Sequence, residues 1–374
     1  MRMRAAVLRA SPVAAPFALS RPLTVEEVEL DEPGHGEVLV RVHATSLCHS
    51  DLSVIDGNRL RPVPMVLGHE AAGEVVRTGP GVGDLFPGDR VVMVFVPSCG
   101  HCMPCAEGRP ALCEPAAAAN AAGEMLAGGR RLSAGGEPIY HHIGVSSFAE
   151  YAVVSRRSLV KIEPDVPYEI ASLFGCAVLT GVGAVVNSAK VKAGETVAVV
   201  GLGGVGLSAL LGAVAAGASR IVAVDLSRDK LARARDLGAT DIFDAGEEGA
   251  IDAIRAITRG GVDHSFEMAG SVKALDLAFQ ITCRGGTTTT AGLANPKHTL
   301  SLSPTRLVAE ERRLQGSYLG SCVPTRDIPR FIALYRRGKL PVDKLWTSSS
   351  SLEKINEGFD ALHEGRTIRH VITM

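Results

Sequence analysis

The pattern of apolar and polar residues changes at about residue 190. Before it, short apolar runs such as EVLVRVHA, AAGEVVRTG and DRVVMVFV alternate with turns rich in Gly, Pro and Asp, which is typical of a strand-rich, mostly antiparallel domain. After it, ETVAVVG, GVGLSALLGAVAAGA and RIVAVD follow one another as strand, helix and strand. Continued repeats of this kind predict a doubly wound parallel sheet of about six strands before residue 320.

The closing segment of the chain adds two helices and a strand. DIPRFIALYRRGKL and SLEKINEGFDALHEG have helical spacing, and TIRHVITM reads as a final strand. The alanine- and glycine-rich stretch at 115–129 predicts a loop or a short helix without a strong apolar face. A chain of 374 residues favours two domains.

Composition narrows the class of protein without naming it. A net charge of -1 with 46% hydrophobic residues indicates a globular protein without global attraction to nucleic acid or to anionic membranes. The N-terminal segment lacks a secretory signal, and no apolar run predicts a membrane span. We therefore expect a cytoplasmic protein, in which clustered cysteines favour metal binding or catalysis over disulfides.

A glycine-rich turn between a predicted strand and a predicted helix indicates a dinucleotide site. Its glycines are Gly201, Gly203, Gly204 and Gly206. Such glycines let the backbone approach a pyrophosphate at the helix N-terminus, and Asp225 at the end of the next strand suits the ribose hydroxyls. The acid favours NAD over NADP. Lys230 either assists at this ribose or is a solvated helix lysine, and a turn used only for packing is the alternative for the glycines.

Four of the eight cysteines lie in SCGHCMPCAEGRPALCEP, as Cys99, Cys102, Cys105 and Cys113. Four thiolates complete a tetrahedral zinc sphere and leave no position for a substrate, so zinc here would be structural. The spacing does not fit the usual iron–sulfur patterns. Free thiols or disulfides are the remaining alternative.

A sparser set offers different chemistry. Cys48 in TSLCHSD, His69 in GHE and Cys176 in FGCAVLTG provide two sulfurs and one imidazole. This set is typical of a catalytic zinc whose fourth position takes water or substrate. Taken singly, each residue also fits an ordinary core position.

The chain resembles the zinc-dependent alcohol dehydrogenases of the medium-chain dehydrogenase/reductase superfamily. The resemblance rests on the order of CHSD, GHE, the four-cysteine comb (Cys99, Cys102, Cys105 and Cys113), GLGGVG and EKINEGFDALHEGRTIRHVITM. The resemblance covers nearly the whole chain, and is strongest to the dimeric type and its glutathione-dependent formaldehyde dehydrogenase relatives. It implies a GroES-like catalytic domain at 1–178, to which 319–374 returns, and a Rossmann NAD-binding domain at 179–318.

The resemblance also implies roles for individual residues near the catalytic zinc. Cys48, His69 and Cys176 would bind it, with Glu70 as an occasional or outer ligand. Asp51 would hydrogen-bond His69 and fix its tautomer, and Ser50 would pass the alcohol proton outward. One catalytic and one structural zinc per chain are expected.

Further residues are assigned to NAD by the same resemblance. His49 and Arg369 would meet the pyrophosphate, or else be a bystander and a strand-edge charge. Thr180 would pack on the nicotinamide. The backbone contacts are expected from Val205 in the glycine turn and from Ala291, Leu293 and Leu319.

The chain departs from the family pattern around the expected substrate pocket. Ser53 stands where the liver type has a relay histidine. His142 replaces an aromatic residue next to His141, and Arg59 replaces an apolar one. We expect His142 and Arg59 either to meet a polar substrate group or to face solvent, while Phe95 remains an aromatic wall. The loop at 115–137 has the length found in dimeric members, which predicts a homodimer.

These features predict an NAD-dependent dehydrogenase for primary or aromatic alcohols and their aldehydes. A formaldehyde dehydrogenase that requires glutathione or mycothiol is the first alternative, because CHSD resembles the CHTD of that branch. A non-catalytic relative with a structural or regulatory role is the alternative from another class. It is disfavoured because both metal sets and the cofactor set are complete, and a zinc-free quinone reductase would lack the comb.

Overall fold

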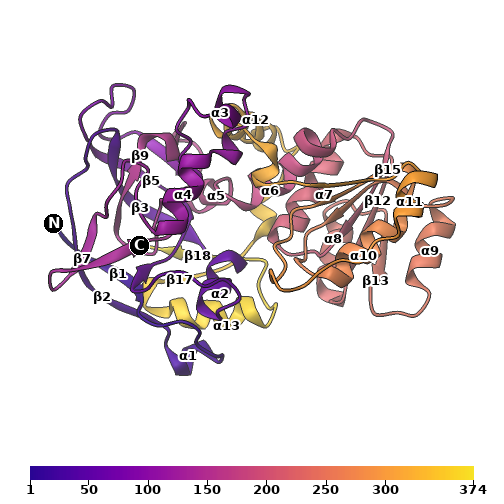
Figure 1. Ribbon diagram of the computed structural model, residues 1–374, viewed down its shortest axis with the longest axis horizontal. Helices are drawn as coiled ribbons and strands as arrows, with labels where there is room; N and C mark the ends of the chain where they lie inside the picture. The colour runs from indigo at the N-terminus through magenta and orange to yellow at the C-terminus, as the bar shows by residue number, and fades with distance from the viewer. The chain divides into compact units, whose positions relative to one another are not determined.

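The computed structural model describes all 374 residues, and its contacts divide them into two compact units. The first unit contains Met1–Cys176, Val323–Pro329 and Trp346–Met374, and the second contains Ala177–Cys322 and Arg330–Leu345. Figure 1 shows the yellow C-terminal segment running among the indigo and magenta strands of the first unit. None of the helices has both the length and the apolar character needed to cross a membrane.

Part of the first unit is a closed barrel. Its strands, in pairing order, are β1 (Arg2–Leu8), β2 (Leu23–Leu30), β7 (Leu132–Ala134), β8 (Glu137–His141) and β4 (Met65–Val66). All of these pairs are antiparallel except β4 with β8. The barrel therefore matches the mostly antiparallel character that the alternating sequence predicted.

A seven-stranded sheet completes the β-structure of this unit. Its path is β10 (Leu159–Ile162), β6 (Arg90–Met93), β5 (Glu70–Thr78), β3 (Glu37–Ser46), β18 (Arg369–Thr373) and β17 (Trp346–Ser351), with β9 (Tyr151–Ser155) also paired to β3. Register places Ser46 opposite both Glu70 and Val371. The end of β3, the start of β5 and the middle of β18 consequently meet at one place in the sheet.

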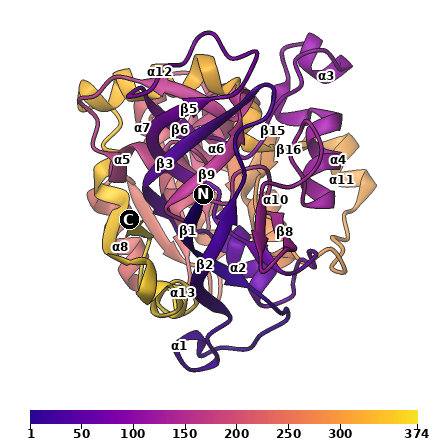
Figure 2. The ribbon, with the colours of Figure 1, turned by 90° about the vertical axis from the view of Figure 1, so that its left-hand side faces the viewer.

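Short helices connect these strands. They are α1 (Phe17–Ser20), α2 (His49–Ile55), α3 (Met103–Ala106), α4 (Glu114–Ala122), α5 (Tyr168–Leu173) and α13 (Ile355–His363), with α12 (Pro324–Arg336) spanning the boundary between the units. The alanine-rich stretch thus forms a short helix, which ends at Gly123 in the left-handed conformation. Figure 2, like Figure 1, shows α3 and α4 next to each other.

The second unit is a wholly parallel six-stranded sheet. Its order is β13 (Asp241–Asp244), β12 (Arg220–Asp225), β11 (Thr196–Val200), β14 (Val262–Glu267), β15 (Thr282–Thr290) and β16 (Arg313–Gly316). The reversal of strand order on either side of β11 is the doubly wound arrangement predicted from the sequence. Its helices are α6 (Ala177–Gly183), continued by a π-helical turn at Ala184–Ala189, α7 (Gly204–Ala216), α8 (Arg228–Asp236), α9 (Ala250–Ile257), α10 (Val272–Ile281) and α11 (Pro304–Ala309).

Local sequence explains how the central crossover forms. The apolar strand β11 is almost completely buried, as expected of a central parallel strand. Helix α7 begins after Gly203 and ends at Gly217, which adopts a left-handed φ of 80°. Ser227 caps the following helix, because its hydroxyl accepts a hydrogen bond from the backbone N–H of Lys230 at 3.4 Å.

Candidate active site

Three potential metal ligands from distant parts of the sequence meet inside the first unit. Cys48 follows β3 and caps α2, His69 immediately precedes β5, and Cys176 is the last residue of the unit's first segment. Their exposed fractions are only 5%, 1% and 6%, and their ligand atoms lie within 4.8 Å of one another. The fold therefore collects the sparse set that the sequence singled out.

The backbone before His69 is specialised to place its ring. Gly68 has φ +89, and a Cβ atom there would come within 2.6 Å of both Phe148 Cδ1 and Ser147 Oγ. Only glycine fits this conformation and this space. The Gly68 N–H donates to Asp51 Oδ1 at 3.1 Å, and His69 Nδ1 lies 3.1 Å from the same oxygen. This contact directs the other ring nitrogen of His69 away from Asp51.

Charge in this buried site is strongly coupled. Burial alone would raise the pKa of Asp51, but His69 and His142 hold it well below its usual value. Burial alone would lower the pKa of His69, but the charges of Asp51 and Cys48 raise it well above its usual value. A hydrogen bond from Cys176 lowers the pKa of Cys48, and the same bond raises the pKa of Cys176. The two thiols, the His69 imidazole and the Asp51 carboxylate are therefore electrostatically coupled.

These residues fit a zinc ion. Two sulfurs and one imidazole are the donor set of catalytic zinc sites that retain one position for substrate. A cation would also offset the buried thiolate charge and take the place of the protons on His69 and Cys176. When bound, zinc polarises an alcohol oxygen and lowers the pKa of the alcohol.

Glu70 and Arg369 form a buried ion pair beside this cluster. Arg369 Nη1 lies 3.4 Å from Glu70 Oε2 and donates to the Leu47 carbonyl at 3.2 Å. Burial alone would lower the pKa of Arg369, but Glu70 and then Cys48 raise it above its usual value. Arg369 thus contributes positive charge next to the two thiols.

Neighbouring side chains surround His69 with rings. Phe95 meets the His69 ring edge-on with centroids 5.5 Å apart, and His142 does so at 5.6 Å. His142 is 3% exposed, so the expectation that its side chain could face solvent is wrong. Burial lowers its pKa. His141 is also buried, whereas Arg59 is half-buried and its N–H donates to the Ser53 carbonyl.

The two residues that follow Cys48 open helix α2. His49 is exposed and Ser50 is half-buried. The Ser53 hydroxyl donates to the His49 carbonyl at 2.7 Å. Ser53 stands where the liver type has a relay histidine, and this backbone contact engages its hydroxyl.

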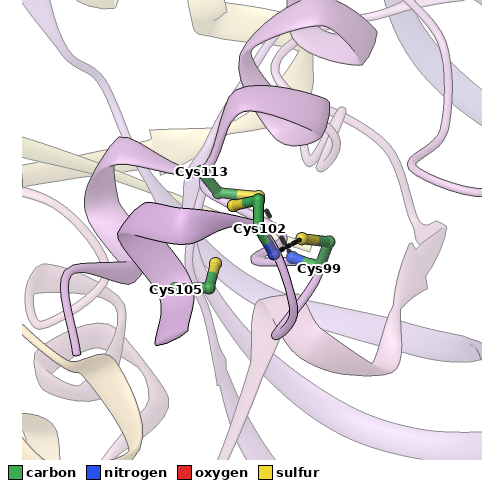
Figure 3. Close-up of side chains that lie close together, drawn as sticks. All are labelled: Cys99, Cys102, Cys105 and Cys113. Carbon is green, nitrogen blue, oxygen red and sulfur yellow. Dashed lines mark hydrogen bonds between the residues drawn. The ribbon is translucent and has the colours of Figure 1, made fainter. Parts of the chain in front are cut away.

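The dense cysteine cluster forms a separate metal-binding arrangement (Figure 3). Sulfur atoms of Cys99, Cys102, Cys105 and Cys113 lie within 4.8 Å of one another. The Cys102 N–H donates to Cys99 Sγ at 3.3 Å, and the Cys99 N–H donates to Cys113 Sγ at 3.1 Å. Burial tends to raise the pKa of Cys99, but the backbone N–H groups of His101 and Cys102 lower it to about 6.

In the same cluster, the pKa of Cys105 is shifted in the opposite direction to that of Cys99. Burial raises the pKa of Cys105 to about 12. Four thiols at this spacing therefore do not all ionise by themselves, whereas a tetrahedral zinc ion binds all four as thiolates. The donor set fits a closed, structural zinc.

The glycine turn of the second unit has the shape of a phosphate site. Gly201 has φ +92, and a Cβ on Gly206 would lie only 1.8 Å from the Gly201 carbonyl oxygen. By contrast, a Cβ on Gly203 would meet nothing within 4 Å. Gly206 is therefore required for packing, while Gly203 borders open space at the N-terminus of α7, where a pyrophosphate would fit. Gly204 and Val205 form the first turn of that helix.

The other residues assigned to NAD have varied environments. Asp225 ends β12, and its carboxylate accepts N–H groups of Leu202 at 2.6 Å and Ser227 at 2.9 Å. Thr180 is buried on α6, and Lys230 is half-buried on α8. In the loop after β15, Ala291 is half-buried and Leu293 is 51% exposed, and Leu319 is buried with φ +50.

Comparison with known proteins agrees with this fold. Residues 34–164 match the alcohol dehydrogenase GroES-like domain, and residues 204–337 match the zinc-binding dehydrogenase family. An S-(hydroxymethyl)glutathione dehydrogenase of Escherichia coli is 38% identical and covers 97% of this chain and 99% of its own length.

Solved structures extend the likeness to three dimensions. An alcohol dehydrogenase zinc-binding domain protein from Burkholderia ambifaria is 36% identical with a TM-score of 0.94, covering 100% of this chain and 99% of its own. Benzyl alcohol dehydrogenase from Acinetobacter calcoaceticus is 32% identical with a TM-score of 0.93 and the same coverage.

The chain therefore belongs to the zinc-dependent alcohol dehydrogenase family of the medium-chain dehydrogenase/reductase superfamily. Its two units are accordingly a GroES-like domain and a Rossmann coenzyme-binding domain, as the sequence predicted. Membership makes it an oxidoreductase with a small-molecule substrate.

Proposed function

We propose that this protein oxidises primary or aromatic alcohols reversibly to aldehydes, with NAD as the hydride acceptor and a catalytic zinc at Cys48, His69 and Cys176. The observation that carries this proposal is the buried two-sulfur, one-imidazole cluster, with ligand atoms within 4.8 Å of one another. Asp51 supports it, because its carboxylate fixes the tautomer of His69.

The chain's own residues have separate tasks in this proposal. Phe95 supplies an apolar wall beside His69, which favours alcohols with apolar or aromatic substituents. The Ser50 hydroxyl accepts the alcohol proton and passes it on. Arg369, which pairs with Glu70, places positive charge beside the thiolates.

NAD is assigned to the second unit. Its pyrophosphate would lie at Gly203, Gly204 and Val205, and Asp225 would bind the ribose hydroxyls and repel a 2′-phosphate. Lys230, Thr180 and the backbone at Ala291, Leu293 and Leu319 would complete that site. Residues 179–318 are our proposed coenzyme domain, and we propose a homodimer.

A panel of substrates tests this function directly. Benzyl alcohol, primary alcohols and aldehydes are supplied with NAD or NADP, each with and without glutathione or mycothiol, and NADH or NADPH formation is followed by absorbance. We expect NAD-dependent oxidation of benzyl alcohol without thiol. Absence of alcohol oxidation under every condition would refute the proposal.

A thiol-dependent formaldehyde dehydrogenase is the second candidate. It is favoured by the 38% identity to an S-(hydroxymethyl)glutathione dehydrogenase over 97% of this chain. The same panel separates the two, because activity on formaldehyde that appears only with added glutathione or mycothiol would select this candidate.

A further inference from the structure

The carboxylate of Asp51 has an unusual set of neighbours. Its side chain is fully buried, and a single oxygen, Oδ1, receives all its close contacts. The Gly68 N–H and His69 Nδ1 each lie 3.1 Å from Oδ1 within hydrogen-bond geometry. His142 Nε2 lies 3.2 Å from the same oxygen as a close electrostatic contact, without hydrogen-bond alignment. Oδ2 has no hydrogen-bond partner. Two imidazoles therefore converge on the same buried oxygen.

The turn that carries His142 is held in a costly conformation. Three of the four residues after it have left-handed backbones, namely Ile143 with φ 40°, Gly144 with φ 72° and Ser146 with φ 56°. For a β-branched residue such as Ile143 this conformation is rare. The Ser146 hydroxyl accepts the His142 N–H at 2.9 Å, and the Val145 N–H donates to the His142 carbonyl at 3.1 Å. Such strain persists only where surrounding contacts enforce it, and it marks functional sites.

We infer that His142 is a positioning residue for the catalytic metal site, and that it acts by holding the Asp51 carboxylate so that Oδ1 faces His69. This inference rests on the proposed zinc site at Cys48, His69 and Cys176. His142 itself is not a ligand of that zinc. If His142 lacked its ring nitrogen, the Asp51 carboxylate would lose one of the contacts that hold Oδ1 in place. The carboxylate could then rotate so that Oδ1 no longer faces His69.

Loss of this support would loosen the metal. Outer partners of a metal-binding histidine fix the orientation of its ring, and their removal costs about 10- to 100-fold in metal affinity. The comb lies on a different segment, and its zinc depends on none of these contacts. The effect of His142 should therefore be confined to one of the two zinc ions.

The test measures zinc release from the purified full-length holoenzyme. Wild type, His142→Phe and His142→Gln are mixed with a chelator and a zinc indicator, and the fast and slow release phases are recorded. Phe keeps the ring that packs on His69 but lacks the nitrogen, whereas Gln can return a nitrogen near the position of Nε2. We expect catalytic zinc to leave about tenfold faster or more in His142→Phe, near the wild-type rate in His142→Gln, and structural zinc to be unaffected in both.

A second comparison isolates the route through Asp51. Adding His142→Phe to Asp51→Asn should change zinc release little beyond Asp51→Asn alone, because the two residues act on one contact. His35→Phe makes the same chemical change at an exposed histidine and should behave like wild type. Should His142→Phe fail to fold, His142→Asn, whose amide is too short to reach Oδ1, takes its place against His142→Gln.

Three results would overturn the inference. The first is a zinc release rate in His142→Phe equal to that of wild type. The second is that His142→Phe speeds zinc release as much in the Asp51→Asn background as in wild type. The third is a third zinc ion in wild type that His142→Phe removes, which would make His142 a ligand. Wild-type enzyme that binds only one zinc, or that oxidises no alcohol, would instead refute the proposed function itself.

Discussion

Replacing His141 by Gln should make the protein less sensitive to mild acid. His141 is 1% exposed, and its Nε2 accepts a hydrogen bond from the Arg131 N–H at 3.0 Å. Burial, and then the charges of Arg131 and Arg130, lower its pKa from 6.5 to about 3. The folded protein therefore keeps this imidazole neutral at pH values where the unfolded chain protonates it.

The size of the effect follows from that pKa. The stability contributed by neutral His141 is complete above pH 6.5, and it is lost as the pH falls toward the folded pKa of about 3. Within this window the unfolded chain carries one proton more, so the free energy of unfolding falls by about 1.4 kcal/mol per pH unit. Between pH 8 and pH 5, His141 alone should remove about 2 kcal/mol.

Urea unfolding at pH 8 and pH 5 measures this difference. The single tryptophan, Trp346, lies in the same unit as His141, so its fluorescence reports the relevant transition. The amide introduced by His141→Gln keeps an acceptor for the Arg131 N–H but does not titrate. Wild type should lose about 2 kcal/mol more than His141→Gln, while the exposed-site control His35→Gln should match wild type. Equal losses in wild type and His141→Gln would refute the reasoning.

Substitutions at four positions probe the cofactor and proton sites. Gly206→Ala should destabilise the second unit by about 1–3 kcal/mol or more in urea unfolding, because the new Cβ would lie 1.8 Å from a carbonyl oxygen. Gly203→Ala should fold normally and bind NAD more weakly in titration calorimetry. Equal stability of the two variants would contradict this prediction. Asp225→Asn should weaken NAD about tenfold or more and raise the NADP-to-NAD ratio of kcat/KM; an unchanged ratio would remove Asp225 from the ribose site. Ser50→Ala should lower kcat about a hundredfold, with Ser50→Thr restoring much of it; full activity of the alanine variant would exclude the hydroxyl as proton acceptor.

The repeated apolar strands and glycine turns were sufficient to predict the parallel sheet. The central strands β11 and β12 are buried apolar runs, and local signals such as Gly203 before α7 and Ser227 before α8 mark the helices of the Rossmann unit. The barrel was harder to derive, because its strands are short and the β4 and β8 pair is parallel. Such pairings depend on long-range register, which no local pattern encodes.

Part of the candidate site could likewise be predicted from the sequence, and part could not. Cys48, His69 and Cys176 were candidates by residue type, but only the family resemblance joined them into one set, since Cys176 lies 128 positions after Cys48. The contact of His142 with Asp51 could not be predicted. It requires a turn in which Ile143 and Ser146 adopt left-handed conformations, and neither residue type announces such a turn.

The central claim is that the sparse ligand set, rather than the dense comb, supports oxidation. NADH formation from benzyl alcohol by Cys48→Ala, measured together with zinc content, tests this most directly, with Cys283→Ala as a matched cysteine control outside both clusters. The account predicts a folded variant with one zinc per chain and activity lower by about a thousandfold or more. Undiminished alcohol oxidation by Cys48→Ala would contradict it.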